Sequence, residues 1–251
     1  MKVFVIKGRV LAVLACVLAA VGMFWAVNHP AVVGVSASAR QLPIYCVQRD
    51  QKMASLSFDA AWGNEDTQQL IDILGAYNVK ATFFVVGDWV DKYPESVKAL
   101  HDAGHEVMGH SNHHDHFNSL TTDQIIADIN ACNDKIEAIT GVRPTLFRPP
   151  YGEYDDHVIK AVRSMGIEPI QWDVDSLDWK DLSAGEITTR VTSTVQAGSI
   201  CLFHNAAKHT PEALPGVIKK LIGEGYTLVP ISELILQGDY TIDHTGRQCP
   251  A

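Results

Sequence analysis

The sequence lacks any long basic run beyond its extreme N-terminus, and it has no internal repeat or low-complexity tract. Its formal net charge is -9 at pH 7. Because an acidic surface repels phosphate backbones, we expect no nucleic-acid partner. With 47% hydrophobic residues among 251, the chain is unlike a disordered or fibrous protein and long enough for one large domain with a sizeable core. We expect this domain to be a monomer.

Cysteine is also sparse, with five residues, and no cysteine spacing is typical of a zinc site. Cys132 and Cys201 fall on apolar faces, which indicates small buried hydrophobic residues. Cys46 and Cys249 flank the predicted domain and could form a disulfide if the compartment oxidises them. The sequence leaves that pairing open.

What the N-terminus does contain is an apolar segment. The first residues carry Lys2, Lys7 and Arg9 and no acid, and residues 10–27 then run without a charge. A basic flank before such a run is typical of a signal peptide or an uncleaved membrane anchor, and the length of the run favours the anchor. A buried core helix is disfavoured because the run has no polar face. We therefore expect residues 1–28 to place the protein outside the cytoplasm, either membrane-anchored or secreted.

The rest of the chain is predicted to form one domain. Residues 29–43 are small, polar or proline-bearing and indicate a linker, whereas residues 239–251 form a polar tail that we expect to lie on the surface or fray. Between them, residues 44–238 alternate apolar runs with helical stretches, which predicts an α/β parallel barrel or a doubly wound sheet. The predicted strands are 53–58, 81–86, 105–109, 146–148, 168–172, 199–203 and 227–229.

Helical periodicity is clearest over residues 122–140. Ser183 and Glu186 have the spacing of a capping box and predict the start of a second helix. A third helix is indicated by the apolar stripe Leu214, Val217, Ile218 and Leu221.

Ionisable residues follow the predicted strands. In parallel α/β folds the carboxyl ends of the strands meet on one face, where functional groups gather. Five strands end this way, so we expect their side chains to converge in an open cleft. The residues, in chain order, are Asp59, His110, Arg148, Asp175 with Asp178, and His204.

Each of these residues also has a structural interpretation. Asp59 could be a general base or the cap of the following loop. His110 and His114 could bind one cation if the backbone between them makes a helical turn, or they could belong to a solvated polar loop. His204 after an apolar strand could be structural, but opposite a base it fits a general acid.

Two further stretches indicate a substrate site. Arg148-Pro149-Pro150-Tyr151-Gly152 is a rigid turn, which suits presenting a backbone N–H to an anionic intermediate, although a plain strand-to-helix turn could use the same residues. The stretch 175–179 pairs two carboxylates with Trp179, which could line an acyl or sugar pocket or simply pack in a charged loop.

Taken together, the segments SFD, HSNHH, RPPYG, DSLDW and LFH, in this order, resemble the five motifs of the polysaccharide deacetylases, the NodB-homology group of carbohydrate esterase family four. The similarity covers roughly residues 50 to 236. The longer form FDAAWG resembles a branch associated with sporulation and Gram-positive cell envelopes. The family implies a distorted (β/α)7 barrel as the single catalytic domain.

The resemblance also implies roles. Asp59 is similar to the catalytic base, Arg148 to the residue that holds this base, Asp178 to the carboxylate that tunes the acid, and His204 to the general acid. The substrate-binding positions are Tyr151, whose backbone N–H helps to form the oxyanion hole, Trp179 in the wall of the acetyl pocket, and Leu202 of the LFH motif. His110 and His114 are similar to the metal-binding histidines.

Ala60 departs from the family pattern. Members usually carry two adjacent aspartates, the second of which is a metal ligand, and here that position is alanine. A divalent metal (zinc, cobalt or nickel) is therefore possible but would be weakly held.

The resemblance implies a hydrolase that removes N-acetyl groups from an envelope glycan, either peptidoglycan or a chitin-like oligomer. The competing hypothesis is a catalytically silent glycan-binding protein of the cell or spore envelope on the same fold, which Ala60 favours and the intact acid/base residues disfavour. A cytosolic amidohydrolase is disfavoured by the N-terminal segment.

Overall fold

The computed structural model describes residues 8–28 and 40–251, which divide into two compact units, Met1–Arg40 and Gln41–Ala251. In the first unit, α1 (Gly8–Asn28) covers the apolar run. Among the residues described, no helix qualifies as long and apolar enough to cross a membrane. The predicted linker over 29–43 lies largely outside the described residues.

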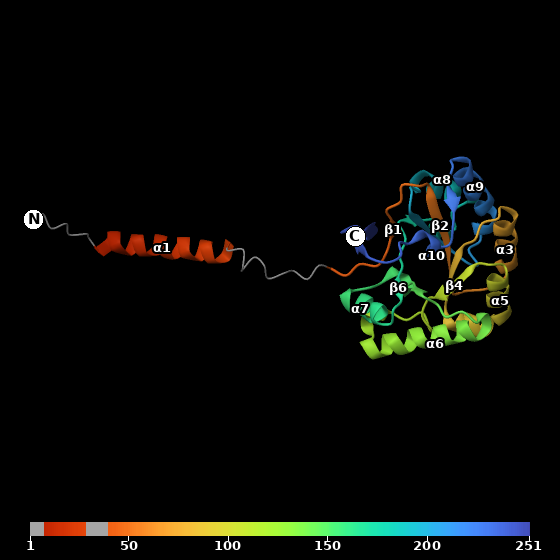
Figure 1. Ribbon diagram of the computed structural model, residues 1–251, viewed down its shortest axis with the longest axis horizontal. Helices are drawn as coiled ribbons and strands as arrows, with labels where there is room; N and C mark the ends of the chain where they lie inside the picture. The colour runs from red at the N-terminus through yellow and green to blue at the C-terminus, as the bar shows by residue number, and fades with distance from the viewer. Residues whose placement is uncertain (1–7, 29–39) are drawn as a thin grey trace, which may run out of the picture. The chain divides into compact units, whose positions relative to one another are not determined.

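The second unit is an α/β barrel (Figure 1). Each of the seven predicted strand regions contains a strand, and the sequence pattern misses four short ones. The strands are β1 (Cys46–Val47), β2 (Met53–Ala60), β3 (Thr82–Val85), β4 (Glu106–Gly109), β5 (Leu146–Phe147), β6 (Glu168–Pro169), β7 (Val174–Asp175), β8 (Ser199–His204), β9 (Thr227–Leu228), β10 (Tyr240–Ile242) and β11 (Arg247–Pro250).

The sheet follows the order β10-β11-β1-β8-β2-β3-β4-β5-β6, with β7 paired to β8 and β9 paired to β2. Residues 44–47 join the two ends of the row of parallel strands. Ile44 bridges Ile170 just after β6, and Val47 of β1 donates to the Gly198 carbonyl just before β8. A short irregular segment thus closes the ring that the parallel strands leave open. The predicted distorted barrel is confirmed.

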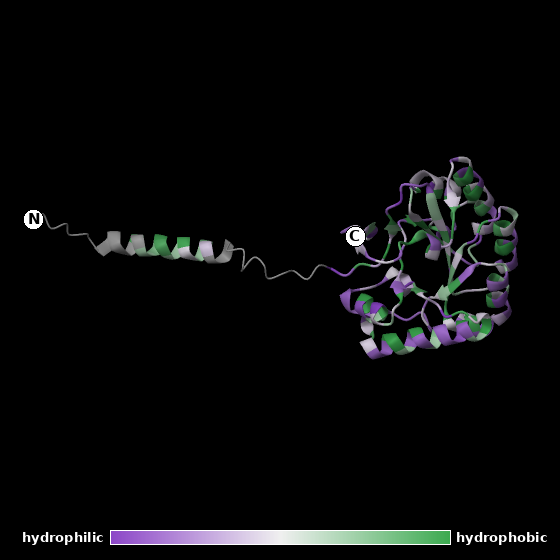
Figure 2. Ribbon diagram, in the orientation of Figure 1, coloured by the Kyte–Doolittle hydropathy of each residue, from purple (hydrophilic) through white to green (hydrophobic). Residues whose placement is uncertain are grey.

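Helices cover the outer face of the sheet. They are α3 (Thr67–Ala76), α4 (Gly87–Lys92), α5 (Pro94–Asp102), α6 (Thr122–Thr140), α7 (Asp156–Ser164), α8 (Ala184–Thr194) and α9 (Thr210–Gly223), while the short α10 (Ile231–Leu234) packs with the inner residues. Figure 2 shows hydrophobic residues gathered on the strands and on one side of the helices. The helices predicted over 122–140, after Ser183 and along the Leu214 stripe are all confirmed, and Ser183 forms the expected capping box with Glu186.

Strand alternation in β2 separates the core from the site. Leu56, Phe58 and Ala60 belong to the apolar cluster beneath the helices, whereas Ser57 and Asp59 point the other way and bind Arg148. The period of two in a single strand therefore places an apolar anchor and a charged functional residue side by side.

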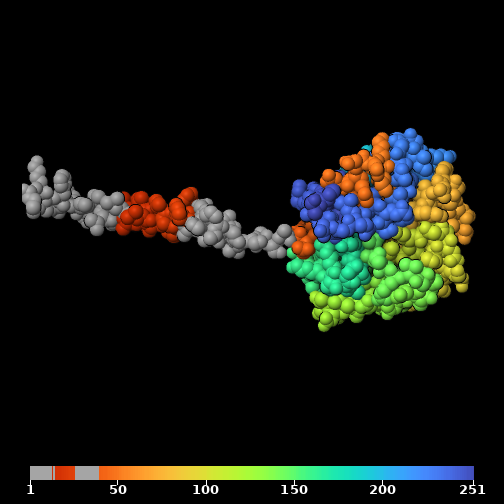
Figure 3. Space-filling model, viewed as in Figure 1, coloured from red at the N-terminus to blue at the C-terminus, as the bar shows by residue number. Residues whose placement is uncertain are grey.

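The predicted C-terminal tail is part of the sheet. Over residues 239–251, β10 and β11 form an antiparallel pair, and β11 runs parallel to β1 with Cys46 opposite Arg247. In Figure 3 the dark-blue C-terminal residues lie against the orange segment near β1. The polar composition hid these strands, because they lie at the edge of the sheet and only partly in the core. Cys46 and Cys249 are both free thiols.

Candidate active site

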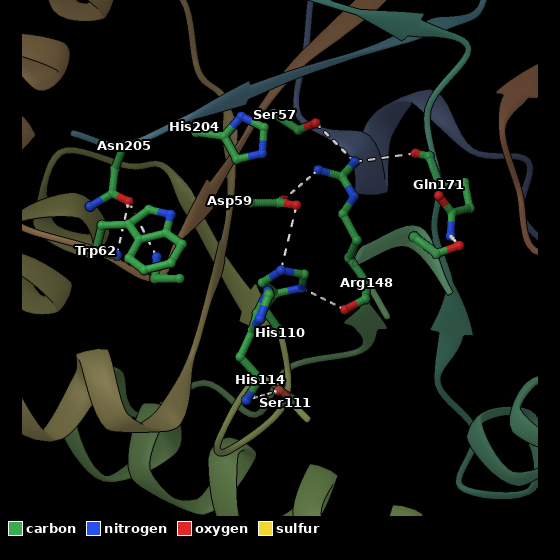
Figure 4. A network of polar contacts seen from close by, with 12 residues as sticks. Ser57, Asp59, Trp62, His110, Ser111, His114, Arg148, Gln171, His204 and Asn205 are labelled. Carbon is green, nitrogen blue, oxygen red and sulfur yellow. Dashed lines mark hydrogen bonds and ion pairs between the residues drawn. The ribbon is translucent and has the colours of Figure 1, made fainter. Parts of the chain in front are cut away.

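The ionisable residues that follow the strands lie around one cavity of about 410 Å³. Its lining includes the predicted residues Asp59, His110, His114, Tyr151, Asp175, Trp179, Leu202 and His204, together with Ala61, Trp62, Gly152 and Trp172. Arg148 lies beneath the cavity and Asp178 behind His204, each bonded to a lining residue (Figure 4 shows Arg148, Asp59 and His204). The structure thus brings together all the residues that the sequence singles out.

Asp59 and Arg148 form a buried ion pair at the floor. Nη1 of Arg148 donates to Oδ1 of Asp59 at 2.7 Å, and Nη2 donates to Oγ of Ser57 at 2.9 Å and to the carbonyl of Gln171 at 3.2 Å. The guanidinium carbon lies 4.2 Å from the centre of the Phe84 ring. These contacts hold Arg148 in one orientation and aim it at Asp59 (Figure 4).

Burial would raise the pKa of Asp59, but the Arg148 charge and hydrogen bond outweigh it, so the pKa lies below its usual value. Asp59 is therefore ionised at neutral pH. The expectation of an open cleft is wrong for this residue, which is only 6% exposed. Two fixed charges are thus held at the bottom of the cavity, out of bulk water.

His204 and Asp178 form a second pair at the end of β8. Nδ1 of His204 donates to Oδ1 of Asp178 at 2.7 Å, and the other carboxylate oxygen accepts from the His204 backbone N–H at 2.8 Å and from Oγ1 of Thr210 at 2.7 Å. Burial would lower the pKa of His204, but the hydrogen bond and charge of Asp178 raise it above the usual value. The bond to Nδ1 leaves Nε2 as the nitrogen available to a ligand.

His110 has a different environment. Its Nδ1 lies 2.6 Å from the Arg148 carbonyl oxygen, and because a carbonyl can only accept, Nδ1 carries the proton. Burial lowers the pKa of His110, so the ring is neutral. Its Nε2 thus bears a lone pair and lies 3.6 Å from Oδ2 of Asp59.

His114 lies next to His110, with ring centroids 5.0 Å apart. The helical turn that was the condition for a shared cation is not formed between them. Instead, Ser111 and His114 have left-handed φ angles of 70° and 59°, and Oγ of Ser111 accepts from the His114 backbone N–H. Burial lowers the pKa of His114 to about 4. Both rings are therefore neutral near pH 7, the form in which imidazole binds metals.

The donor set for a metal stops at these two rings. Ala60 offers no donor, and the Asn112 amide nitrogen lies 2.7 Å from Nε2 of His113. Within 8–28 and 40–251, no three His, Cys, Asp or Glu side chains are grouped so that they could hold a metal ion. A catalytic zinc site usually has three protein ligands. The residues present therefore do not fit a tightly held catalytic metal.

Backbone strain is concentrated around the cavity. Five of the non-glycine residues with left-handed φ lie in its loops, namely Ser111, His114, Tyr151, Leu177 and Ala206. At Gly152, next to Tyr151, φ is +66° and a Cβ would lie 2.8 Å from the Trp172 ring, which explains the glycine in RPPYG. Such conformations persist where the surrounding structure enforces them, and they often mark functional sites.

The sequence pattern missed the residues that hold these groups in place. Ser57 and Gln171 fix Arg148, Thr210 fixes Asp178, and Asn205 binds the loop after β2. Asn205 directly follows LFH and Ser57 is the first residue of SFD, so both could have been found from the motifs. Thr210 carries no local signal, because its contact with Asp178 spans 32 residues.

Comparison with known proteins identifies the family. The polysaccharide deacetylase family model matches residues 47–170. The peptidoglycan-N-acetylmuramic acid deacetylase PdaA of Bacillus subtilis (strain 168) is 31% identical over 197 residues, which are 77% of this chain and 75% of that protein. The chain belongs to the polysaccharide deacetylase family. The peptidoglycan-N-acetylmuramic acid deacetylase PdaC of the same organism is 38% identical over 75% of this chain, but the match spans only 40% of its length.

A solved structure from the same family bears on the competing hypothesis. BA3943 from Bacillus anthracis, described as a family-four pseudoenzyme, superposes with a TM-score of 0.74 at 35% identity over 81% of this chain and 70% of its own. A mutant of that protein is described as having restored enzymatic activity. Members with and without activity therefore share this fold.

Proposed function

We propose that this polysaccharide deacetylase hydrolyses the N-acetyl groups of an envelope glycan outside the cytoplasm. The supporting observation is that two separately built charged pairs, Asp59–Arg148 and His204–Asp178, face one cavity. Binding a neutral acetylated sugar requires neither a buried carboxylate nor an imidazole with a raised pKa. A general acid and a general base at opposite sides of a scissile amide require both.

Three residues of the cavity act directly in this reaction. Asp59, kept ionised by Arg148, accepts a proton from the water that attacks the acetamide carbonyl. The backbone N–H of Tyr151 donates to the developing oxyanion. His204, protonated through its bond to Asp178, gives the proton from Nε2 to the departing amine. The products are acetate and a free amino sugar.

The walls of the cavity suit the substrate. Leu202 and Trp179 would enclose the acetyl methyl group, and Trp172 closes the floor above Arg148. Water excluded from these apolar surfaces strengthens the interactions of the charged groups. Three-ligand metal chemistry is not part of the proposal, because the donor set of this chain is incomplete.

A catalytically silent glycan-binding protein is the second candidate, favoured by Ala60 and by the similarity to a pseudoenzyme. Mass spectrometry of acetylated chitooligomers and peptidoglycan after incubation with the protein separates the two. Loss of acetyl groups is the result that the deacetylase proposal requires. Glycan binding with unchanged masses would support the silent protein instead.

The location outside the cytoplasm rests on the basic flank and the apolar run 10–27, and on relatives named as peptidoglycan deacetylases. We propose that residues 1–28 export the chain and that it stays membrane-anchored. External protease on intact cells, followed by fractionation, should degrade the protein in the membrane fraction. Full-length protein that is soluble and protected inside the cell would contradict this proposal.

A further inference from the structure

Trp62 has no role in the proposed reaction, yet it lines the cavity with 68% of its surface exposed. A tryptophan side chain usually contributes to folding stability because its large apolar surface is buried. It lies three residues beyond Asp59, in the loop between β2 and α3. Its exposure therefore costs hydrophobic stabilisation without any contribution to the proton transfers.

The loop that carries Trp62 is held firmly. Oδ1 of Asn205 accepts from the backbone N–H groups of Ala61 at 3.2 Å and Trp62 at 3.5 Å, and the amide nitrogen of Asn205 donates to the Gly63 carbonyl (Figure 4 shows Trp62 and Asn205). Nε1 of Trp89 donates to the same carbonyl at 3.0 Å. Asn205 itself is only 2% exposed.

Two buried side chains thus fix the backbone on both sides of an exposed indole. An aromatic side chain that is pre-positioned in this way binds a ligand with little loss of conformational entropy. It has two further exposed aromatic neighbours on the rim of the same cavity, Tyr151 at 60% and Trp179 at 58%. The rim therefore offers flat apolar surfaces, while the charged groups lie on the floor.

We propose that Trp62 is a stacking platform for a sugar ring adjacent to the one that loses its acetyl group, and that Asn205 positions it. The flat C–H face of a pyranose packs on an indole in the way that aliphatic groups pack on aromatic rings. The reacting acetamide must lie at the floor, near Asp59 and His204, so a platform on the rim meets the next sugar of the chain. This inference rests on the proposed glycan substrate, but not on turnover.

The test is binding of N-acetylglucosamine and its di-, tri- and tetrasaccharide by calorimetry, with every variant in a His204→Ala background that suppresses hydrolysis. Trp62→Ala should weaken binding of the tetrasaccharide roughly three- to tenfold and leave the monosaccharide unchanged. Trp62→Phe keeps an aromatic ring and should retain part of the tetrasaccharide affinity that Trp62→Ala loses. Ile222→Ala, which shortens an exposed side chain on α9, is the matched control and should change neither the tetrasaccharide affinity nor the monosaccharide affinity.

The role of Asn205 is tested by a double-mutant cycle. If Asn205 acts on the glycan through Trp62, Asn205→Ala should weaken tetrasaccharide binding, and the Trp62→Ala, Asn205→Ala protein should bind no more weakly than Trp62→Ala alone. Thermal unfolding of each variant checks that the domain is folded.

Equal tetrasaccharide affinity in Trp62→Ala and its parent would overturn the platform. So would an equal loss for the monosaccharide, because that places Trp62 at the reacting sugar. Binding without deacetylation by the wild-type protein would leave the platform intact and remove only the enzyme proposal. Absence of binding to every oligomer in the parent would remove both.

Discussion

The histidines on the two sides of the cavity differ in the direction of their pKa shifts, although all three lie at or beyond the ends of strands of one sheet. His204 bonds a carboxylate through Nδ1, and its pKa is raised. His110 bonds a main-chain carbonyl and is buried, and its pKa is lowered, as is that of His114. The partner of Nδ1 and the degree of burial, not the position along a strand, therefore separate a proton donor from a neutral ligand-like ring.

Removing the acid or the base should have the largest effect. We expect Asp59→Asn and His204→Ala each to lower the deacetylation rate by roughly 10²-fold or more, the scale of general acid-base catalysis. Release of acetate from N-acetylated oligomers measures it. Wild-type rates in either variant would contradict the assigned roles.

The same two variants should differ in stability. His204→Ala removes a partly exposed ring, and the buried Asp178 carboxylate keeps its hydrogen bonds from Thr210 and from the backbone N–H of residue 204, so its loss of stability should be the smaller of the two. Asp59→Asn leaves the fully buried Arg148 without its counter-charge and should cost about 3–5 kcal/mol. Denaturant unfolding of both proteins checks this difference, which would vanish if the buried pair contributed nothing.

Asp178→Asn should make His204 resemble His110. The raised pKa of His204 keeps it protonated at higher pH, so activity should fall as pH rises through that pKa. Without the Asp178 charge, the pKa of His204 drops and the alkaline limb of the pH–rate profile moves to lower pH. On that limb the rate at a fixed pH should fall roughly tenfold for each pH unit by which the limb moves. An unshifted limb would show that another group sets it.

The free energy of unfolding should also fall as pH rises, for the same reason. Protonated His204 stabilises the fold through Asp178, and this contribution is complete below the usual histidine pKa and is lost as pH rises through the folded one. Asp178→Asn should therefore lose more stability at pH 5 than at pH 9. Thermal unfolding at the two pH values measures it.

The smallest expected effect concerns the neutral pair His110 and His114. We expect the wild-type protein to carry substoichiometric metal, and added divalent cation to raise any activity. Ala60→Asp supplies the carboxylate that the family usually has there, and should tighten zinc binding in calorimetry. Because Ala60 is only 1% exposed, an unpaired carboxylate should destabilise the variant, and zinc should restore its melting temperature.

Two results would contradict this expectation. One tightly bound metal in the wild-type protein after dialysis against a chelator would show that another group completes the site. An Ala60→Asp protein that is destabilised and does not respond to zinc would show that the new carboxylate points into the apolar cluster with Phe58.

Much of this arrangement is encoded locally and was predictable. Helix 122–140 has an apolar stripe from which its limits were predicted, and the structure adds a Thr121–Gln124 capping box at its start. The strand ends at Asp59, His110, Arg148 and His204 follow apolar runs, so their convergence could be predicted from the topology.

Contacts between distant segments could not be predicted. The burial of Asp59 depends on Arg148, 89 residues away, and on the barrel that closes around both. The left-handed residues Ser111 and His114 bring the His110 and His114 rings together without a helical turn, because Oγ of Ser111 accepts from the His114 backbone N–H. The polar strands β10 and β11 lack the apolar alternation that would have revealed them.

The pairing of β1 with β11 has a consequence for folding. Cys46 and Arg247 are register partners about 200 residues apart in the chain, and β1 also pairs with β8. Contacts between such distant segments form slowly, since a long loop must close first. The free edge of β1 stays unpaired until β11 has been synthesised, so the last residues of the chain complete the sheet that the first strand begins.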